Sequence, residues 1–217
     1  FNIGRIAFFD FTSIPAANGT DTTIVDPIAG RVKRPDEQFT ITGTATAPTA
    51  TFALAGHSMG GRIALEVMRL APQRVERLAL LDTGIHPFAA GEAGAKEKAG
   101  RMALLELAQN QGMRVMGAQW LRGMVHPSVQ GTALFEQILD MLERSSPAQF
   151  EAQIAALLGR PDAAPVLPTI ACPTLVLSGR EDLWSPPEQH AAIASAIPGA
   201  KLVIVEQCGH MATVEQP

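Results

Sequence analysis

The feature that most constrains the fold of this chain is the sequence GHSMG at residues 56–60. It follows an apolar run at residues 52–55 and precedes a helical pattern at residues 62–70, which predicts a tight turn between a buried strand and a helix. Such a turn strains the backbone of its central residue, and glycine at the flanking positions lets the neighbouring backbone pass. We therefore expect Ser58 at the edge of a sheet as a candidate nucleophile, with the Met59 N–H as an oxyanion donor.

Strand and helix signals alternate along much of the chain after residue 51. Apolar runs at residues 78–81, 173–177 and 202–205 predict three more buried strands, and residues 187–197 predict another helix. Continuous apolar strands that alternate with helices indicate an α/β fold, with a mainly parallel sheet and helices on both faces. Residues 83–169 interrupt the alternation, and they predict a helical insertion with helices at residues 96–111, 113–124, 132–144 and 147–158.

The first part of the chain has a different composition, since 10 of the 15 threonines lie between residues 12 and 51. Short strands are predicted at residues 5–9 and 22–25, and residues 38–51 predict extended chain that ends in a linker. We therefore divide the chain into three parts: an atypical N-terminal segment that is a candidate source of edge strands (1–46), an α/β core (47–82 and 170–217) and the helical insertion (83–169).

A serine hydroxyl needs a base and an orienting acid to act as a nucleophile near neutral pH. Of the five histidines, His210 is the candidate base, because it follows the strand predicted at residues 202–205 in the sequence EQCGH. His57 lies within the turn, where its side chain is expected to point away from Ser58. The remaining three are assigned to loops or a pocket wall (His86 and His126) and to a solvated helix surface (His190).

The candidate acid is Asp182, which lies just beyond the strand predicted at residues 173–177. Asp82, at the end of a neighbouring predicted strand, is the alternative acid, because such a strand end can also supply the carboxylate. Glu206 and Glu181 are weaker candidates. The structural alternative for Asp182 is a helix cap or an ion pair within a loop.

The order Ser58, Asp182, His210, with each residue at the carboxyl end of a predicted parallel strand, is the order found in α/β-hydrolases. Residues 51–217 resemble that superfamily in its small serine esterase and lactonase type, through the segments FALAGHSMGGRIALEVM, VERLALLDTG, CPTLVLSGREDLWSPPEQH and IPGAKLVIVEQCGHMATVEQP. The resemblance implies hydrolysis through an acyl-enzyme on Ser58, with no metal and no organic cofactor. It also implies that residues 83–169 form a cap over the active site.

The first 46 residues do not resemble the family. Its members usually carry several strands and helices ahead of the nucleophile, with a His-Gly loop that supplies a second oxyanion N–H, and no His-Gly pair precedes Ser58 in this sequence. They also usually continue past the position of His210 with a final helix. The part left for the sheet is short for such a fold, so a rearranged, truncated or frame-altered chain is an alternative that the sequence leaves open.

Composition excludes several classes of partner. The 217 residues are 47% hydrophobic and 18% charged, with a net charge of −4 and a pI near 5.7, so neither nucleic acid nor an acidic membrane surface is expected as a partner. No apolar run reaches the roughly 18 residues of a membrane span, and the first residues lack the features of a signal peptide. We expect a cytoplasmic protein in which Cys172 and Cys208 are buried and reduced, and we allow for a homodimer.

The predicted insertion contains five of the eight methionines, and methionine adapts its shape to irregular apolar ligands. No cationic cluster is apparent in the sequence, so we expect a small, neutral, apolar ester or lactone as the substrate. The side chains expected to contact it are those of His57, Met113, Met116, Trp120, Met124, Trp184 and Met211. The alternative is that the methionines only form contacts between the helices of the insertion.

The candidate triad is compatible with three functions. The first is hydrolysis of carboxylic esters, as an esterase or lactonase. The second keeps the triad but uses it for cofactor-free perhydrolysis or for hydrolysis of C–C bonds. The third is a non-catalytic or impaired protein that keeps the scaffold for binding. Haloalkane dehalogenases and epoxide hydrolases are not expected, because the resembling enzymes of those classes carry Asp at the position of Ser58.

Overall fold

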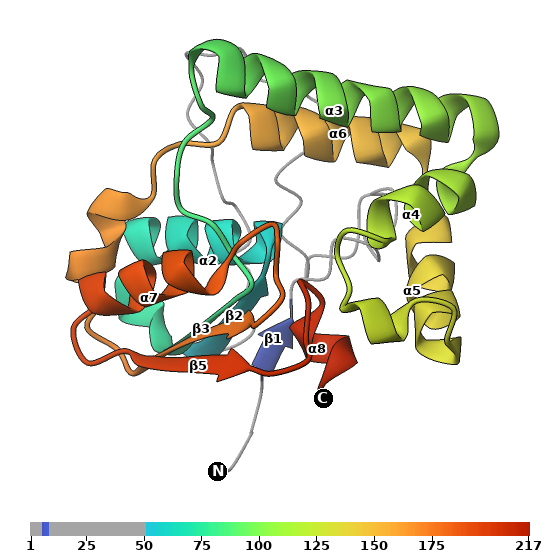
Figure 1. Ribbon diagram of the computed structural model, residues 1–217. Coiled ribbons are helices and arrows are strands. Elements are labelled where there is room, and N and C mark those ends of the chain that lie inside the picture. The colour runs from blue at the N-terminus through green and yellow to red at the C-terminus, as the bar shows by residue number, and fades with distance from the viewer. Residues whose placement is uncertain (1–5, 9–50) are drawn as a thin grey trace.

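A computed structural model describes residues 6–8 and 51–217 of the chain (Figure 1). Within these ranges its centre is a parallel sheet with the strand order β1-β2-β3-β4-β5. The strands are β1 (Ile6–Phe8), β2 (Phe52–His57), β3 (Val75–Leu81), β4 (Thr174–Gly179) and β5 (Lys201–Val205). The strand predicted at residues 5–9 corresponds to β1, and the four predicted after residue 51 are all present. The strand predicted at residues 22–25, and the extended chain up to residue 50, lie outside the described residues.

The register of the sheet brings the carboxyl ends of its strands to one edge. His57 at the end of β2 is paired with Leu81 at the end of β3, and Leu81 is paired in turn with Leu177 of β4. Loops that follow these strands therefore begin side by side, as in other parallel α/β sheets. Ser58 and Asp82, each the first residue after its strand, lie at this edge.

Three helical segments pack against the sheet and form its core: α2 (Met59–Leu70), the 3₁₀ helix η3 (Ala164–Thr169) and α7 (Pro187–Ala196). Leu65 of α2 and Ile193 of α7 meet Leu54, Leu80 and Val176 of the strands, and each of these side chains is almost fully buried. Burial of one such side chain contributes about 1.5–3 kcal/mol to folding. Because η3 contacts α2 and α7, the last residues of the predicted insertion pack with the sheet and not with the other helices of the insertion.

The rest of the insertion, which is called the cap from here on, forms a separate group of helices. Its helices are α3 (Gly91–Gln111), α4 (Met113–Leu121), α5 (Ala133–Glu143) and α6 (Pro147–Leu158), with a short 3₁₀ helix η2 (Pro127–Val129). Helices α3 and α6 lie side by side over the α2 end of the sheet, and α4 packs between α3 and α5 (Figure 1). The cap has its own apolar core, which includes Leu105, Met116, Phe150 and Ile154.

The predicted helices are present, but three of their ends differ from the prediction by three or more residues. Helix α2 begins at Met59 and not at residue 62, because the glycines after Ser58 form its first turn. Helix α3 begins at Gly91 and not at residue 96, since glycines in its first turns hide the start of a helical pattern. Helix α4 ends at Leu121, three residues early, where the chain turns tightly and the Met124 N–H donates to the Leu121 carbonyl. None of the described helices is both long and apolar enough to cross a membrane.

Candidate active site

Ser58 occupies a sharp turn between β2 and α2. Its backbone has φ 53° and ψ −117°, in a region that non-glycine residues rarely adopt, and its N–H is fixed by a 2.8 Å hydrogen bond to the Leu81 carbonyl. A Cβ atom on Gly56 would lie 2.3 Å from the Gly60 carbonyl oxygen, so the turn cannot close over a larger residue. The expected strand-turn-helix arrangement around Ser58 is therefore present.

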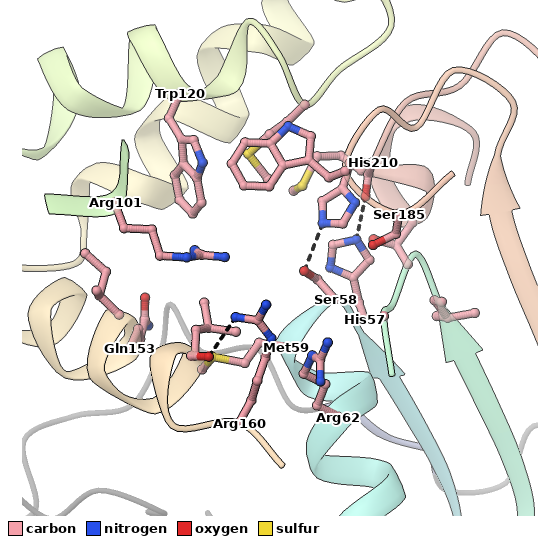
Figure 2. Close-up of a pocket in the computed structure, with 18 of the residues that line it drawn as sticks. His57, Ser58, Met59, Arg62, Arg101, Trp120, Gln153, Arg160, Ser185 and His210 are labelled. Carbon is pink, nitrogen blue, oxygen red and sulfur yellow. Dashed lines mark hydrogen bonds between the residues drawn. The ribbon is translucent and has the colours of Figure 1, made fainter. Parts of the chain in front are cut away.

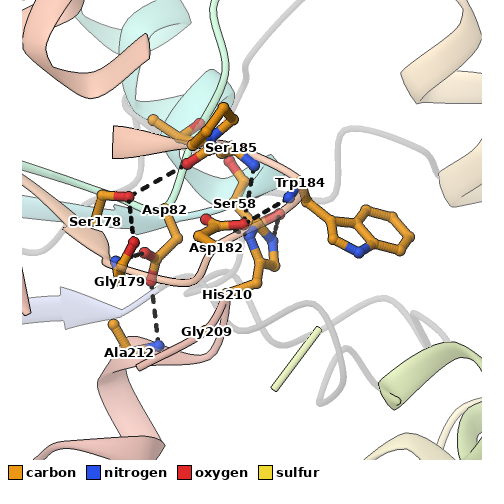
Figure 3. A network of polar contacts seen from close by, with 12 residues as sticks. Ser58, Asp82, Ser178, Gly179, Asp182, Trp184, Ser185, Gly209, His210 and Ala212 are labelled. Carbon is orange, nitrogen blue, oxygen red and sulfur yellow. Dashed lines mark hydrogen bonds and ion pairs between the residues drawn. The ribbon is translucent and has the colours of Figure 1, made fainter. Parts of the chain in front are cut away.

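Ser58, His210 and Asp182 form a chain of hydrogen bonds (Figures 2 and 3). His210 Nε2 lies 2.8 Å from Ser58 Oγ, and His210 Nδ1 lies 2.9 Å from Asp182 Oδ2. His210 and Asp182 are almost fully buried. The carboxylate can only accept, so Nδ1 carries the proton, which leaves the lone pair of Nε2 to face the serine hydroxyl.

The loop after β4 holds Asp182 in place. Its second oxygen, Oδ1, accepts hydrogen bonds from the N–H groups of Trp184 (2.8 Å) and Ser185 (2.9 Å). The structural alternative considered for Asp182, a local cap, is thus also present, and it uses the other carboxylate oxygen. One residue both closes its own loop and orients His210.

A buried glutamate, Glu215 of α8 (Ala212–Glu215), holds the loop that carries His210. Its carboxylate accepts hydrogen bonds from the N–H groups of Gly209 and Met211 in that loop. It also accepts the N–H of His126, a residue of the cap, at 2.7 Å. The His210 N–H donates to the Met124 carbonyl at 2.6 Å, and a Cβ atom on Gly209 would lie 2.4 Å from that same carbonyl oxygen. The sequence carries no local signal for the role of Glu215, because its partners in the loop of His210 and in the cap are set by tertiary contacts.

Asp82, the alternative acid, has different partners. Its side chain is fully buried and accepts hydrogen bonds from the N–H groups of Gly179 (3.0 Å) and Ala212 (3.2 Å), as Figure 3 shows. Its Oδ2 also lies 3.5 Å from Nε2 of His57. Asp82 therefore links the end of β4 to α8, and Asp182 is the carboxylate beside His210.

The expected orientation of His57 is wrong. Its ring lies next to that of His210, with centroids 5.3 Å apart, and its Nε2–H donates to the His210 carbonyl at 2.6 Å. The ring turns this way because Asp82 and that carbonyl offer it partners. Burial lowers the pKa of His57, but Asp82 and the His210 carbonyl raise it by more, so the pKa lies above its ordinary value.

His190 is not a solvated surface residue, contrary to expectation. It is fully buried; its Nε2 accepts the Thr83 N–H at 2.9 Å and its Nδ1–H donates to the Pro186 carbonyl. Burial lowers the pKa of His190. Because Nε2 accepts a hydrogen bond, it carries no proton and the ring is neutral. The Thr83 hydroxyl in turn donates to the Ser58 carbonyl at 2.6 Å, so His190 supports the turn of the candidate nucleophile.

The remaining polar candidates lie apart from the hydrogen-bonded triad. Glu206 pairs with Arg180 on the surface, and Glu181 accepts the Cys208 N–H. His126 Nδ1 accepts the Ser128 N–H at the start of η2. Cys172 and Cys208 are both free thiols, Cys208 being buried and Cys172 only partly so. Burial, with nearby carboxylates, raises the pKa of the Cys208 thiol to about 12, which keeps it protonated.

The Met59 N–H is the candidate oxyanion donor. Met59 begins α2 and lines the same cavity as Ser58, and amides in the first turn of a helix have no acceptor within it. Most of the segment in which the resemblance places a second donor, residues 9–50, lies outside the described residues. In the part of the chain that is described, no group of three or more His, Cys, Asp or Glu side chains could hold a metal ion.

Ser58 and His210 open into a cavity of about 650 Å³ between the sheet edge and the cap. Five of the seven expected substrate contacts line it: His57, Trp120, Met124, Trp184 and Met211. Met113 and Met116 do not, since they are buried in the cap core beside Leu105 and Phe150. For these two the alternative of contacts between helices is correct, because they lie on the face of α4 that is turned toward α3 and α6.

The expectation that no cationic cluster exists is wrong. Arg62 from α2, Arg101 from α3 and Arg160 just after α6 all line the cavity, and Figure 2 shows all three extending toward the space in front of Ser58. The cluster is invisible in the sequence because its members are 39 or more positions apart. Glu97 also lines the cavity and pairs with Arg101 and Arg160.

Known proteins share this sequence pattern and fold. A sequence model of the alpha/beta hydrolase family matches residues 10–217. The chain belongs to that family. This confirms both the resemblance and the predicted α/β-hydrolase fold, which the solved structure described below shares.

The relatives of this α/β-hydrolase have several activities. RutD of Klebsiella pneumoniae, named as a proposed carbamate hydrolase, is 28% identical over 178 residues, which cover 76% of this chain and 61% of that protein. A 2-hydroxy-6-oxononadienedioate/2-hydroxy-6-oxononatrienedioate hydrolase of the same organism is 26% identical over 180 residues, which cover 75% of this chain and 57% of that protein. The structure of a thermophilic esterase from Thermogutta terrifontis, with malate bound, has a TM-score of 0.70 at 30% identity and covers 78% of this chain and 61% of that one. The chain thus spans about three fifths of the length of these relatives.

Proposed function

We propose that this α/β-hydrolase cleaves carboxylic esters through an acyl-enzyme on Ser58. The observation that carries the proposal is the unbroken chain of hydrogen bonds from Ser58 through His210 to Asp182, at a cavity large enough for a small ester. Its 30% identity to the Thermogutta esterase supports this class of reaction. Carbonyl addition by a serine needs an aligned base and acid, and the three side chains have that alignment.

In the first half of the reaction, Ser58 Oγ attacks the ester carbonyl and His210 Nε2 takes its proton. Asp182 holds the imidazole in the required tautomer and stabilises the imidazolium. Negative charge develops on the former carbonyl oxygen, where the Met59 N–H and the positive end of α2 stabilise it. The bond to the alcohol oxygen then breaks as His210 returns the proton to that oxygen.

In the second half, water attacks the acyl carbon while His210 takes one of its protons. Collapse of the tetrahedral intermediate breaks the bond to Ser58 Oγ and releases the carboxylic acid. The proton then returns from His210 to Ser58, which regenerates the starting state. The transfers between Ser58 and His210 take place across the 2.8 Å contact of Oγ with Nε2. The transfers to the alcohol and from water use the same nitrogen, with the alcohol or the water next to it.

A fluorophosphonate probe, which reacts with activated serines, tests the proposal on the full chain. We expect labelling of the wild type and none of Ser58→Ala. Ser195→Ala, which removes an exposed hydroxyl on α7, serves as the matched control and should be labelled like the wild type. A series of 4-nitrophenyl esters of increasing acyl length would measure turnover on the same three proteins. Folded wild-type protein that resists the probe would refute the proposal, and ester binding without turnover would indicate a binding protein.

Hydrolysis of a C–C bond is the second candidate, because a relative 26% identical to the chain carries the name of such an enzyme. The triad would then act on a ketone, and the group released from the acyl carbon would be a carbanion that takes up the proton held by His210. Product analysis separates the two functions, since ester cleavage releases an alcohol and C–C cleavage does not. Perhydrolysis is tested in the same assay by adding peroxide and measuring halogenation.

A further inference from the structure

The cavity in front of Ser58 has two chemically different walls. One is apolar and includes Trp120, Met124 and Met211. The other carries the guanidinium groups of Arg62, Arg101 and Arg160, together with the amides of Gln153 and Gln189 and the ring of His86. In Figure 2 the three arginines approach the same space from α2, α3 and the loop that follows α6.

The charges on this polar wall do not balance. Among the described residues that line the cavity, Glu97 is the only carboxylate facing three guanidinium groups. Both of its carboxylate oxygens already accept hydrogen bonds: Arg160 donates to them at 2.7 and 2.8 Å, and Arg101 donates to one of them. This pairing lowers the pKa of Glu97 to about 2. Among the described residues, the wall therefore keeps a formal surplus of positive charge.

Arg62 shows the effect of that surplus. Its Nη2 donates to the His86 carbonyl at 2.9 Å, a neutral acceptor. Burial, and then the charge of Arg160, lower the pKa of Arg62 to about 10. The guanidinium stays charged at neutral pH, in a place where a cation is unfavourable. An anion bound in the cavity would offset this directly.

Resting on the ester hydrolysis proposed above, we propose that the substrate carries a free carboxylate, which binds to Arg62, Arg101 and Arg160 while its ester carbonyl lies at Ser58. A guanidinium presents two parallel N–H donors that match a carboxylate, as Arg160 already does with Glu97. The apolar wall then contacts the carbon chain between the two groups. The substrate class is a half-ester of a dicarboxylic acid, in place of the neutral ester expected from the sequence.

Two substrates that differ only in charge test this proposal: mono(4-nitrophenyl) adipate and its methyl ester, both assayed by release of nitrophenol. We expect the wild type to favour the charged substrate in kcat/KM by about 10- to 100-fold, mostly through KM. Arg62→Gln should bring this ratio close to one. Arg62→Lys keeps the charge but lacks the two parallel N–H donors, so its ratio should lie between those of Arg62→Gln and the wild type. Arg144→Gln, an exposed arginine that does not line the cavity, should keep the wild-type ratio. A wild-type ratio near one, or a ratio that Arg62→Gln leaves intact, would overturn the proposal.

Binding of adipate to Ser58→Ala, measured by calorimetry, needs no turnover. We expect adipate to bind, with a Kd raised about 10-fold or more when Arg62→Gln is added. If the fluorophosphonate probe fails to label Ser58 but adipate still binds in this Arg62-dependent way, ester hydrolysis is refuted and the carboxylate site is supported. Tighter binding of inorganic phosphate than of adipate, or adipate binding that does not depend on Arg62, would refute a carboxylate site.

Discussion

Two aspartates follow neighbouring strands of the sheet, and their surroundings give them different roles. Asp182 receives one N–H from the ring of His210 and two from its own loop. Asp82 receives two backbone N–H groups, from Gly179 and Ala212, and faces the ring of His57. The first carboxylate orients the proposed base, whereas the second joins the two segments that carry the proposed acid and base.

Replacing each aspartate by asparagine should separate these roles. Asp182→Asn lets the amide favour the wrong tautomer of His210, so kcat should fall by about 10,000-fold. Asp82→Asn should lower kcat by less than about 10-fold but reduce the free energy of unfolding by about 1–3 kcal/mol, because one backbone N–H loses its acceptor. Steady-state kinetics and chemical denaturation measure both. Equal losses of kcat in the two variants would contradict the assignment.

The raised pKa of His57 predicts a pH-dependent contribution to stability. The folded protein holds the His57 proton more tightly than the unfolded chain, whose pKa is near 6.5. The stabilisation is therefore complete below about pH 6.5 and is lost as the pH rises through the higher, folded-state value. We expect His57→Gln to lower the free energy of unfolding more at about pH 5.5 than at about pH 9. Denaturant titrations at both values test this, and a pH-independent difference would contradict it.

At the residue scale, sequence reasoning could bring Ser58, Asp182 and His210 together because each follows a strand, and parallel strands end at one edge. It could not place His190, which accepts a hydrogen bond from Thr83, more than 100 positions away. Nor could it find the arginine cluster, since no local pattern relates α2 to the cap. Such side chains are defined by contacts between elements, and one sequence contains no direct signal for those contacts.

At the scale of elements, the loop after β5 depends on a short helix that follows it. Glu215 of α8 accepts hydrogen bonds from three N–H groups: two buried ones in the loop of His210 and a partly buried one, that of His126, in the cap. Without that carboxylate the loop would have unsatisfied donors in a buried site. Helix α8 thus fixes the position of His210 through the residues on either side of it, Gly209 and Met211.

Glu215→Gln should therefore weaken both fold and site. The amide offers one acceptor oxygen where the carboxylate offers two, and its NH₂ group faces N–H donors. We expect the free energy of unfolding to fall by about 2–4 kcal/mol and the amide of Gly209 to exchange its hydrogen faster. Hydrogen exchange read out by mass spectrometry would measure both effects. Unchanged protection of the loop would show that Glu215 is not its anchor.

The strands and cap helices were predictable because their signals are local. Apolar runs of four to five residues mark β2 to β5, and helix-forming stretches mark the cap. The ends of α2 and α3 were less accurate, because glycines that serve close packing or a turn hide the start of a helix. The assignment of η3 to the sheet layer depends on its contacts with α2 and α7, which no local pattern predicts.

At the scale of the whole molecule, one stretch of the cap joins both halves of the site. The Gly123 carbonyl accepts the indole N–H of Trp184 beside Asp182, at 2.9 Å. The next residue, Met124, accepts the His210 N–H, and His126 donates to Glu215. The segment 123–126 therefore ties the cap to the loops of both the acid and the base, so the cap and the sheet should unfold together.

The chain's two tryptophans report on this coupling, because Trp120 of the cap and Trp184 of the acid loop form an edge-to-face pair with centroids 5.7 Å apart. We expect the near-ultraviolet circular dichroism of this pair and the far-ultraviolet signal of the helices to be lost in one thermal transition. In Glu215→Gln, which removes the acceptor of the His126 N–H, the indole signal should be lost at a lower temperature than the helix signal. Glu136→Gln, an exposed carboxylate paired with Arg114 on the outside of the cap, is the matched control and should keep the two transitions together. Separate transitions in the wild type would mean that the cap leaves the sheet before the core unfolds, and that segment 123–126 does not couple them.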